Sequence, residues 1–131
     1  MTLLISGGAG FIGPSLIERA ARDGHDAVVI DNFSRGRREH LNASTIVIEA
    51  DLARPESVEH VLKALGSKKI DQCWHLAANS DIPAGVTDAT VDLRDTFLAA
   101  QGVDVGASLC EHDLADTARE IIASAKAAGC E

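Results

Sequence analysis

The stretch TLLISGGAGFIG, residues 2–13, decides the fold. Its first five residues form a short apolar run, which is typical of a strand buried in a parallel sheet. The glycines that follow fit the pattern G-x-G-x-x-G through Gly8, Gly10 and Gly13, and Gly7 extends them to a glycine at every third position. From Ile12 onward, apolar residues recur at helical spacing, so the glycines are expected to join a strand to a helix.

The same alternation continues along the chain. Strands are predicted at residues 27–31, 45–49 and 70–76, a second helix begins at Pro55, and residues 32–42 read as a loop with a helical turn. Strands separated by helices indicate a parallel sheet with right-handed crossovers. We therefore predict an α/β fold: a three-layer, Rossmann-like parallel sheet with strand order 3-2-1-4, a truncated form of the doubly wound sheet.

A glycine loop between strand and helix is suited to a dinucleotide. Glycines let the backbone approach a pyrophosphate, and the helix that follows directs its free N–H groups at the phosphates. Asp31 ends the second predicted strand, 18 residues after Gly13, where an acid accepts hydrogen bonds from an adenosine ribose. The alternative is a glycine-rich turn beside a solvated aspartate.

Residues 79–90 are expected to form a long loop and residues 91–101 a helix. A second loop is expected at 103–112, and a final helix is expected from Asp113 to near Gly129. The fourth predicted strand is apolar and would be an unprotected edge of the sheet, so two copies are expected to pair there or through the helices beside it, forming a homodimer. The alternative is that the final helix folds back to cover this edge.

Composition narrows the partners and the compartment. The 131 residues carry a formal charge of −8 and are 46% hydrophobic, with no apolar run long enough to span a bilayer. This charge disfavours nucleic acid and anionic membranes as partners. The N-terminus has no basic segment typical of a signal peptide, and Cys73, Cys110 and Cys130 are widely spaced. We therefore expect a cytoplasmic protein with reduced thiols and, because Cys110 and His112 lack ligand spacing, no metal site.

Four segments in order, MTLLISGGAGFIG, VVIDNFSRGRREHL, EADLARPES and HLAANSDIPAG, resemble the cofactor half of extended short-chain dehydrogenases/reductases. The resemblance covers residues 1 to about 97 and is strongest to nucleotide-sugar epimerases and dehydratases. It implies an NAD site in which the glycine loop holds the pyrophosphate, two strand ends hold the adenosine, and the fourth strand end lies beside the second ribose. The residues so implied are Gly7, Gly10, Phe11, Ile12 and Gly13; Asp31, Asn32, Ser34 and Gly36; Asp51 and Leu52; and Leu76, Ala77 and Ala78.

The family's chemistry also requires a Tyr-x-x-x-Lys pair, and the sequence contains no tyrosine. We therefore predict cofactor binding without turnover, and no catalytic residue is assigned. A purely structural protein and an active epimerase/dehydratase fragment are the alternatives. Arg35, Arg37 and Arg38 could bind the 2′-phosphate of NADP, but Asp31 would repel that phosphate, which favours NAD.

The last part of the chain has a different resemblance. TFLAAQG, at residues 96–102, and VDVGASLCEHDLADTAREIIASAKAAGCE after it are similar to an internal stretch of bacterial phosphoglycerate kinase. That kinase's adenosine-binding glycines and basic phosphoglycerate site have no counterpart here, so kinase activity is not implied. Two families meeting near residue 95 indicate a chimera, with a natural fusion as the alternative. We expect residues 1–131 to form one Rossmann-like domain, with an epimerase-like part at 1–95 and a kinase-like part at 96–131.

Overall fold

The computed structural model describes residues 1–88 and 90–100, which build a parallel sheet between two helical layers. The strands are β1 (Thr2–Ser6), β2 (Asp26–Asp31), β3 (Ile46–Glu49) and β4 (Gln72–His75). Every pairing between them is parallel, and their order is β3-β2-β1-β4. The predicted α/β class and the strand order 3-2-1-4 are therefore confirmed.

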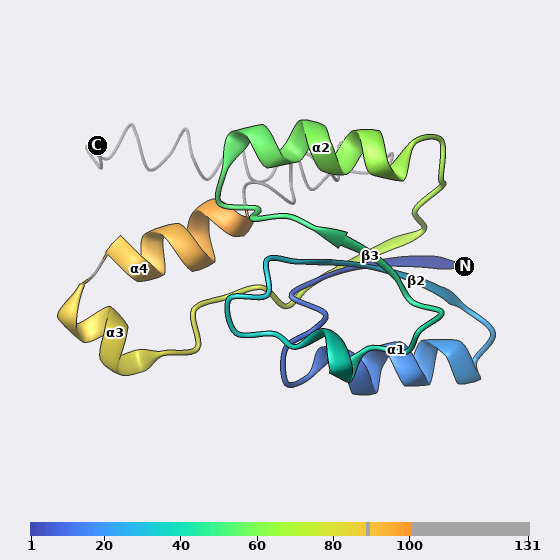
Figure 1. Cartoon of the computed structure of the whole chain (residues 1–131), viewed down its shortest axis with the longest axis horizontal. Helices are drawn as coiled ribbons and strands as arrows, with labels where there is room; N and C mark the ends of the chain where they lie inside the picture. The colour runs from blue at the N-terminus through green and yellow to red at the C-terminus, as the bar shows by residue number, and fades with distance from the viewer. Residues whose placement is uncertain (89, 101–131) are drawn as a thin grey trace.

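Helices α1 (Gly13–Arg22) and α2 (Pro55–Leu65) cover opposite faces of the sheet, so the predicted three layers are present (Figure 1). Side chains alternate between the faces along each strand, as the two-residue period of a strand requires. On β1, Leu3 and Ile5 pack in the same cluster as Ile17 of α1, whereas Leu4 packs with Val61 of α2. Fully burying one such aliphatic side chain stabilises the fold by about 1.5–3 kcal/mol.

The two helices begin and end where the sequence indicates. A proline lies in the first turn of each, where its missing N–H costs nothing, and Gly24 and Gly66 follow the last turns with positive φ angles of 74° and 59°. The expected helical turn after β2 is η1 (Arg38–His40). β4 is shorter than the predicted 70–76.

The prediction of a long loop at 79–90 is wrong, because a helix, α3 (Ile82–Thr87), lies within it. Asp81 caps this helix by accepting a hydrogen bond from the N–H of Ala84 at 3.1 Å, and a proline again occupies the first turn. Asp81 is therefore the N-terminal cap of this helix. The signal was present in the order Asp81-Ile82-Pro83, which is typical of a helix start.

The next helical segment is α4 (Thr90–Asp92), which continues without a break into a stretch with π-type hydrogen bonds, η2 (Leu93–Leu98). Ala99 follows it and is buried in the same cluster as Val61 and Leu65 of α2, so this segment is tied to the core. The expected end of the helix at Gln101, the loop at 103–112 and the final helix from Asp113 lie outside the described residues.

Within residues 1–88 and 90–100, no helix has both the length and the apolar character needed to cross a bilayer. The same residues contain no group of three His, Cys, Asp or Glu side chains arranged to hold a metal ion.

Candidate functional site

The glycine loop after β1 lies against the end of β4. Gly7 has a φ of +68°, and a Cβ atom at this position would stand 2.6 Å from the amide nitrogen of Ala77. At Gly13 a Cβ atom would stand 2.0 Å from the carbonyl oxygen of Gly8. Only glycine fits either position, because both contacts are with backbone and cannot move aside. Gly13 therefore closes the loop onto the start of α1.

The loop presents free donors at the N-terminus of α1. The N–H of Gly10 donates to the carbonyl of Gly7 at 3.1 Å and closes the turn. Among the described residues, the N–H groups of Phe11 and Ile12 have no hydrogen-bond acceptor, and Ile12 offers no side-chain cap. Unsatisfied N–H groups and the helix dipole together favour an anion at this point.

Asp31 joins the glycine loop to the loop that follows β2. Its side chain belongs to a residue only 7% exposed. One carboxylate oxygen accepts the N–H of Ala9 at 2.9 Å, and the other accepts the N–H of Phe33 at 2.8 Å. Each oxygen keeps a further lone pair, so the carboxylate both fixes the two loops and can accept a hydroxyl from a ligand.

The loop after β2 is short and well bonded. Asn32 accepts the N–H of Ser34 at 3.0 Å and its hydroxyl at 2.8 Å. The N–H of Arg37 donates to the carbonyl of Ala9 at 3.1 Å, which fastens this loop to the glycine loop a second time. A Cβ at Gly36 would lie 2.8 Å from the Cβ of Ala9, so the two loops touch at this glycine.

The ends of β3 and β4 complete the site. After β3, Asp51 accepts the N–H of Ala53 at 3.1 Å and pairs with Arg54 at 3.3 Å, and Leu52 is buried in the core. After β4, the N–H of Leu76 donates to the carbonyl of Ser6 at 2.9 Å, so Ala77 and Ala78 emerge directly beside the glycine loop. All of these residues lie at the carboxyl ends of parallel strands, where open α/β sheets bind ligands.

His75 lies at the end of β4, with its Nδ1 atom 2.6 Å from the hydroxyl oxygen of the buried Ser6. Partial burial lowers the pKa of this imidazole below its ordinary value. The ring is therefore held neutral near pH 7, and it fixes the last residue of β1 before the glycines.

A cleft of about 490 Å³ lies over these strand ends. Every predicted cofactor residue except Gly13 lines it, and Gly13 lies behind the loop it closes. A cleft of this volume is in the range of small-molecule sites. Residues not predicted from the sequence also line it: Ile30, Arg35, Ala50, Asn79, Ser80, Arg94, Asp95 and Ala99. Asn79 and Ser80 directly follow Ala78 in the sequence, so the prediction of cofactor residues could have been extended to them.

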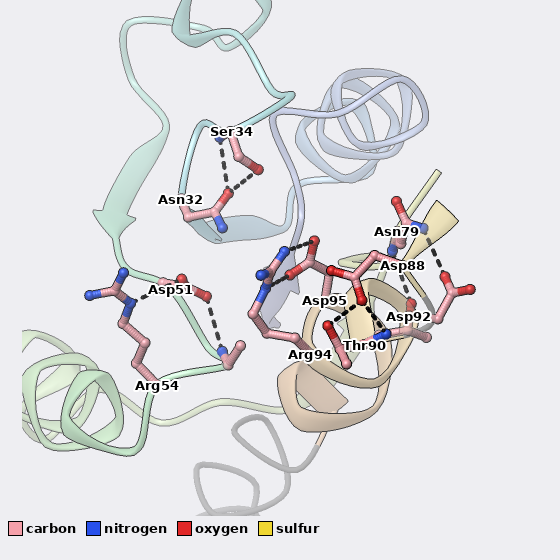
Figure 2. A network of polar contacts seen from close by, with 12 residues as sticks. Asn32, Ser34, Asp51, Arg54, Asn79, Asp88, Thr90, Asp92, Arg94 and Asp95 are labelled. Atoms are coloured by element: carbon pink, nitrogen blue, oxygen red, sulfur yellow. Dashed lines mark hydrogen bonds and ion pairs between the residues drawn. The ribbon is translucent and has the colours of Figure 1, made fainter. Parts of the chain in front are cut away.

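Arg94 and Asp95 come from η2, and no sequence signal places them in the cleft. Figure 2 shows the guanidinium of Arg94 directed away from its helix, between Asp95 and the end of β3. It pairs with Asp95 through two bonds, one of them 3.0 Å long. This hydrogen bonding raises the pKa of Arg94, and the nearby Asp51 carboxylate adds to the shift.

Asn79 fastens η2 and α4 to the end of β4. Its N–H donates to the hydroxyl of Thr96 at 2.9 Å, and its side-chain amide donates to Asp92 at 2.8 Å (Figure 2). Thr96 is the first residue of the kinase-like segment, so these bonds cross the predicted boundary between the two parts of the chain.

The loop after β2 carries three arginines. Arg35 forms an ion pair with Asp81 at 2.7 Å, and this hydrogen bond lowers the pKa of Asp81. Arg38 lies 3.4 Å from Glu49 and places its guanidinium 4.7 Å from the centre of the Phe33 ring. Only Arg35 of the three lines the cleft.

A family model described as the NAD dependent epimerase/dehydratase family matches residues 3–117. The chain belongs to this family. The match includes every element of the cleft and extends past residue 95, so it does not mark a boundary there.

Solved structures of the family share the fold. The chain is 27% identical to a Thermus thermophilus UDP-glucose 4-epimerase in complex with NAD, with a TM-score of 0.71 over 82% of this chain and 33% of that one. It is 34% identical to the Bordetella bronchiseptica enzyme WbmG in complex with NAD, with a TM-score of 0.69 over 82% of this chain and 34% of that one. This chain thus spans about a third of the length of each of these solved structures.

Curated phosphoglycerate kinases are also similar to the chain. The enzyme of Xanthobacter autotrophicus is 38% identical over 133 aligned residues, which cover 90% of this chain and 33% of that protein. That of Azorhizobium caulinodans is 36% identical over 81% of this chain and 31% of that protein. The chain spans about a third of these relatives, and the similarity reaches well outside the predicted segment 96–131. Both resemblances inferred from the sequence are confirmed.

Proposed function

We propose that this chain binds NAD(H) in the cleft over the carboxyl ends of its strands and performs no turnover. The observation that carries the proposal concerns Phe11 and Ile12, whose N–H groups have no acceptor among the described residues and which line the same cleft as the buried Asp31. The N–H groups can hold a pyrophosphate and the carboxylate of Asp31 a ribose hydroxyl, and every dinucleotide presents both of these polar groups.

The remaining predicted residues are proposed to hold the rest of the cofactor. Asn32, Ser34 and Gly36 surround the adenosine ribose beside Asp31, and Asp51 and Leu52 flank the adenine. Leu76, Ala77 and Ala78 accompany the second ribose. The complexes of UDP-glucose 4-epimerase and WbmG with NAD support this assignment, because the chain shares their fold. The carboxylate of Asp31 favours NAD over NADP by repelling a 2′-phosphate.

Absence of turnover rests on the lack of tyrosine in the 131 residues. An acid/base of the Tyr-x-x-x-Lys kind needs a phenolic hydroxyl, and no other residue of the described cleft offers one. We accordingly assign binding and no catalytic residue. We further propose a cytoplasmic protein of one domain, made as a chimera that joins the two resemblances near residue 95.

Isothermal titration calorimetry of the purified chain with NADH tests the proposal. A site formed by one cofactor domain is expected to give a Kd of roughly 10 μM to 1 mM, about −7 to −4 kcal/mol. Calorimetry is preferable to fluorescence because Trp74, the one tryptophan, is not among the residues that line the cleft. No heat at millimolar NADH refutes binding, and measurable epimerase or dehydratase activity refutes the absence of turnover.

One observation favours the alternative of a structural chimera with no tight ligand. The carboxylate of Asp95 lines the cleft, where it would repel a pyrophosphate. Its pairing with Arg94 offsets that charge. Replacing Asp95 with Asn removes the repulsion, so a large gain in NADH affinity in this variant would favour the structural reading of the parent chain.

A further inference from the structure

Of the charged side chains around the cleft, Arg35 has a partner that comes from a distant part of the chain. Its guanidinium donates to Asp81 at 2.7 Å, and the two residues are 46 positions apart. Arg35 follows β2 and Asp81 follows β4, and these strands lie on either side of β1. The ion pair therefore links the segments that follow two strands on either side of β1.

We propose that Asp81 is a specificity-determining residue, which holds Arg35 away from the 2′-position of the bound adenosine ribose and so disfavours NADP. The inference rests on the proposed function, because it concerns which dinucleotide the same cleft accepts. It adds to the repulsion by Asp31 a second, separate reason for selectivity.

The three arginines after β2 differ in what they can offer a 2′-phosphate. Arg37 and Arg38 do not line the cleft, and Arg38 is placed between Glu49 and the Phe33 ring. Arg35 does line it, so it is the cation of this loop in position to meet a phosphate on the ribose. The Asp81 carboxylate offsets the charge of this guanidinium and holds it toward the start of α3, so turning the guanidinium to a phosphate on the ribose weakens the ion pair.

Asp81 is the fixed partner of the pair. Its carboxylate accepts the N–H of Ala84 at the start of α3, and its own N–H donates to the side chain of Asn79 at 2.9 Å. The side chain of Arg35 is 62% exposed, against 30% for Asp81. The anchored acid thus sets the position of the more exposed guanidinium.

The variant Asp81→Asn tests this role with little risk to the fold. Asparagine is as good a helix cap as aspartate, so the bond to Ala84 is retained while the charge that attracts Arg35 is lost. We expect the ratio of the Kd for NADP⁺ to the Kd for NAD⁺, measured by calorimetry on the full chain, to fall by about three- to tenfold. This change corresponds to about 0.7 to 1.4 kcal/mol.

Two control variants separate the ion pair from a general charge effect. Asp88→Asn removes an acid from the far end of α3, where the side chain bonds Thr90 and not Arg35, and should leave the ratio unchanged. The double variant Arg35→Gln with Asp81→Asn should not show the fall in the Kd ratio that Asp81→Asn alone produces, because the guanidinium that binds the 2′-phosphate is absent. Circular dichroism of each variant verifies that α3 and the sheet are intact.

Each outcome bears on a different claim. The role of Asp81 is overturned, while NAD binding stays in place, by any of three results. The Kd ratio is unchanged in Asp81→Asn, it falls equally in Asp88→Asn, or its fall persists in the double variant. If the parent chain binds neither dinucleotide at millimolar concentration, the proposed function itself fails, and the selectivity inference fails with it.

Discussion

Replacing Gly10 with Val is expected to abolish tight cofactor binding while leaving the fold intact. A Cβ at this position would meet a single atom within 4 Å, the carbonyl oxygen of Gly7 at 3.2 Å, and Gly10 lines the cleft. The valine side chain therefore extends into the volume proposed for the pyrophosphate. Forcing a few extra methyl groups into an occupied space costs about 1–3 kcal/mol, which weakens binding by about 5- to 150-fold.

The effect on stability should be small, because the side chain enters open space. The slight crowding at Gly7 is opposed by the lower entropy of the unfolded chain that accompanies loss of a glycine. We expect the free energy of unfolding to change by less than about 1 kcal/mol. Urea unfolding followed by circular dichroism measures this change, and calorimetric titration with NADH measures the affinity.

Two further variants calibrate the result. Gly10→Ala adds one methyl group and should give an intermediate loss of affinity. Gly13→Ala places a Cβ 2.0 Å from the backbone oxygen of Gly8, so it should destabilise the fold itself. If Gly10→Val binds NADH as tightly as the parent chain, the cofactor does not lie on this loop. If it unfolds while Gly13→Ala stays folded, the geometry derived for the loop is wrong.

Three other predictions concern the surroundings of the loop. Asp31→Ala removes both acceptors that join Ala9 to Phe33, and should lower the free energy of unfolding by at least about 2 kcal/mol in urea titrations at pH 7; a change within error would contradict the tie between the loops. Burial lowers the pKa of His75, so as pH falls below about 6.5 the imidazole takes up a proton more readily in the unfolded chain than in the folded chain. The free energy of unfolding should therefore decrease as pH falls through this range. In His75→Asn the decrease between about pH 7.5 and 5 should be shallower. Equal slopes would exclude His75 as the cause. Light scattering should find a homodimer, twice 13.7 kDa, formed through β4, an edge strand of the described sheet, or the helices beside it; a monomer at high concentration would contradict this.

The sequence determined the strand–loop–helix unit at the start of the chain, because the signals there are local. An apolar run, glycines at fixed spacing and a helical stripe each act over fewer than a dozen residues, and together they specify β1, the glycine loop and α1. The alternation of apolar strands and helices then restricted the sheet to a few orders, since its crossovers are right-handed, and the glycine loop after the first strand favoured 3-2-1-4. Asp31 was located for the same reason, as the last residue of β2.

Where local signals were weak, prediction was less successful. The helix α3 was read as loop because its six residues, IPAGVT, are too few to show a helical period and include a proline and a glycine, although Asp81 and Pro83 mark its start. β4 was expected to be apolar, yet Gln72 and Trp74 are exposed in the described sheet.

Only the tertiary structure decided which side chains share the cleft. Arg94, Asp95 and Ala99 come from a helix whose position depends on the path of the chain after β4, and that path is set by the bonds of Asn79 to Asp92 and Thr96. The pairing of Arg35 with Asp81 likewise joins the ends of two strands that are separated in the sheet by β1. Periodicity specifies which face of an element is buried, but contacts between loops follow from how the crossovers bring strand ends together. The glycine loop was therefore readable from the sequence, whereas the charged residues that surround it were not.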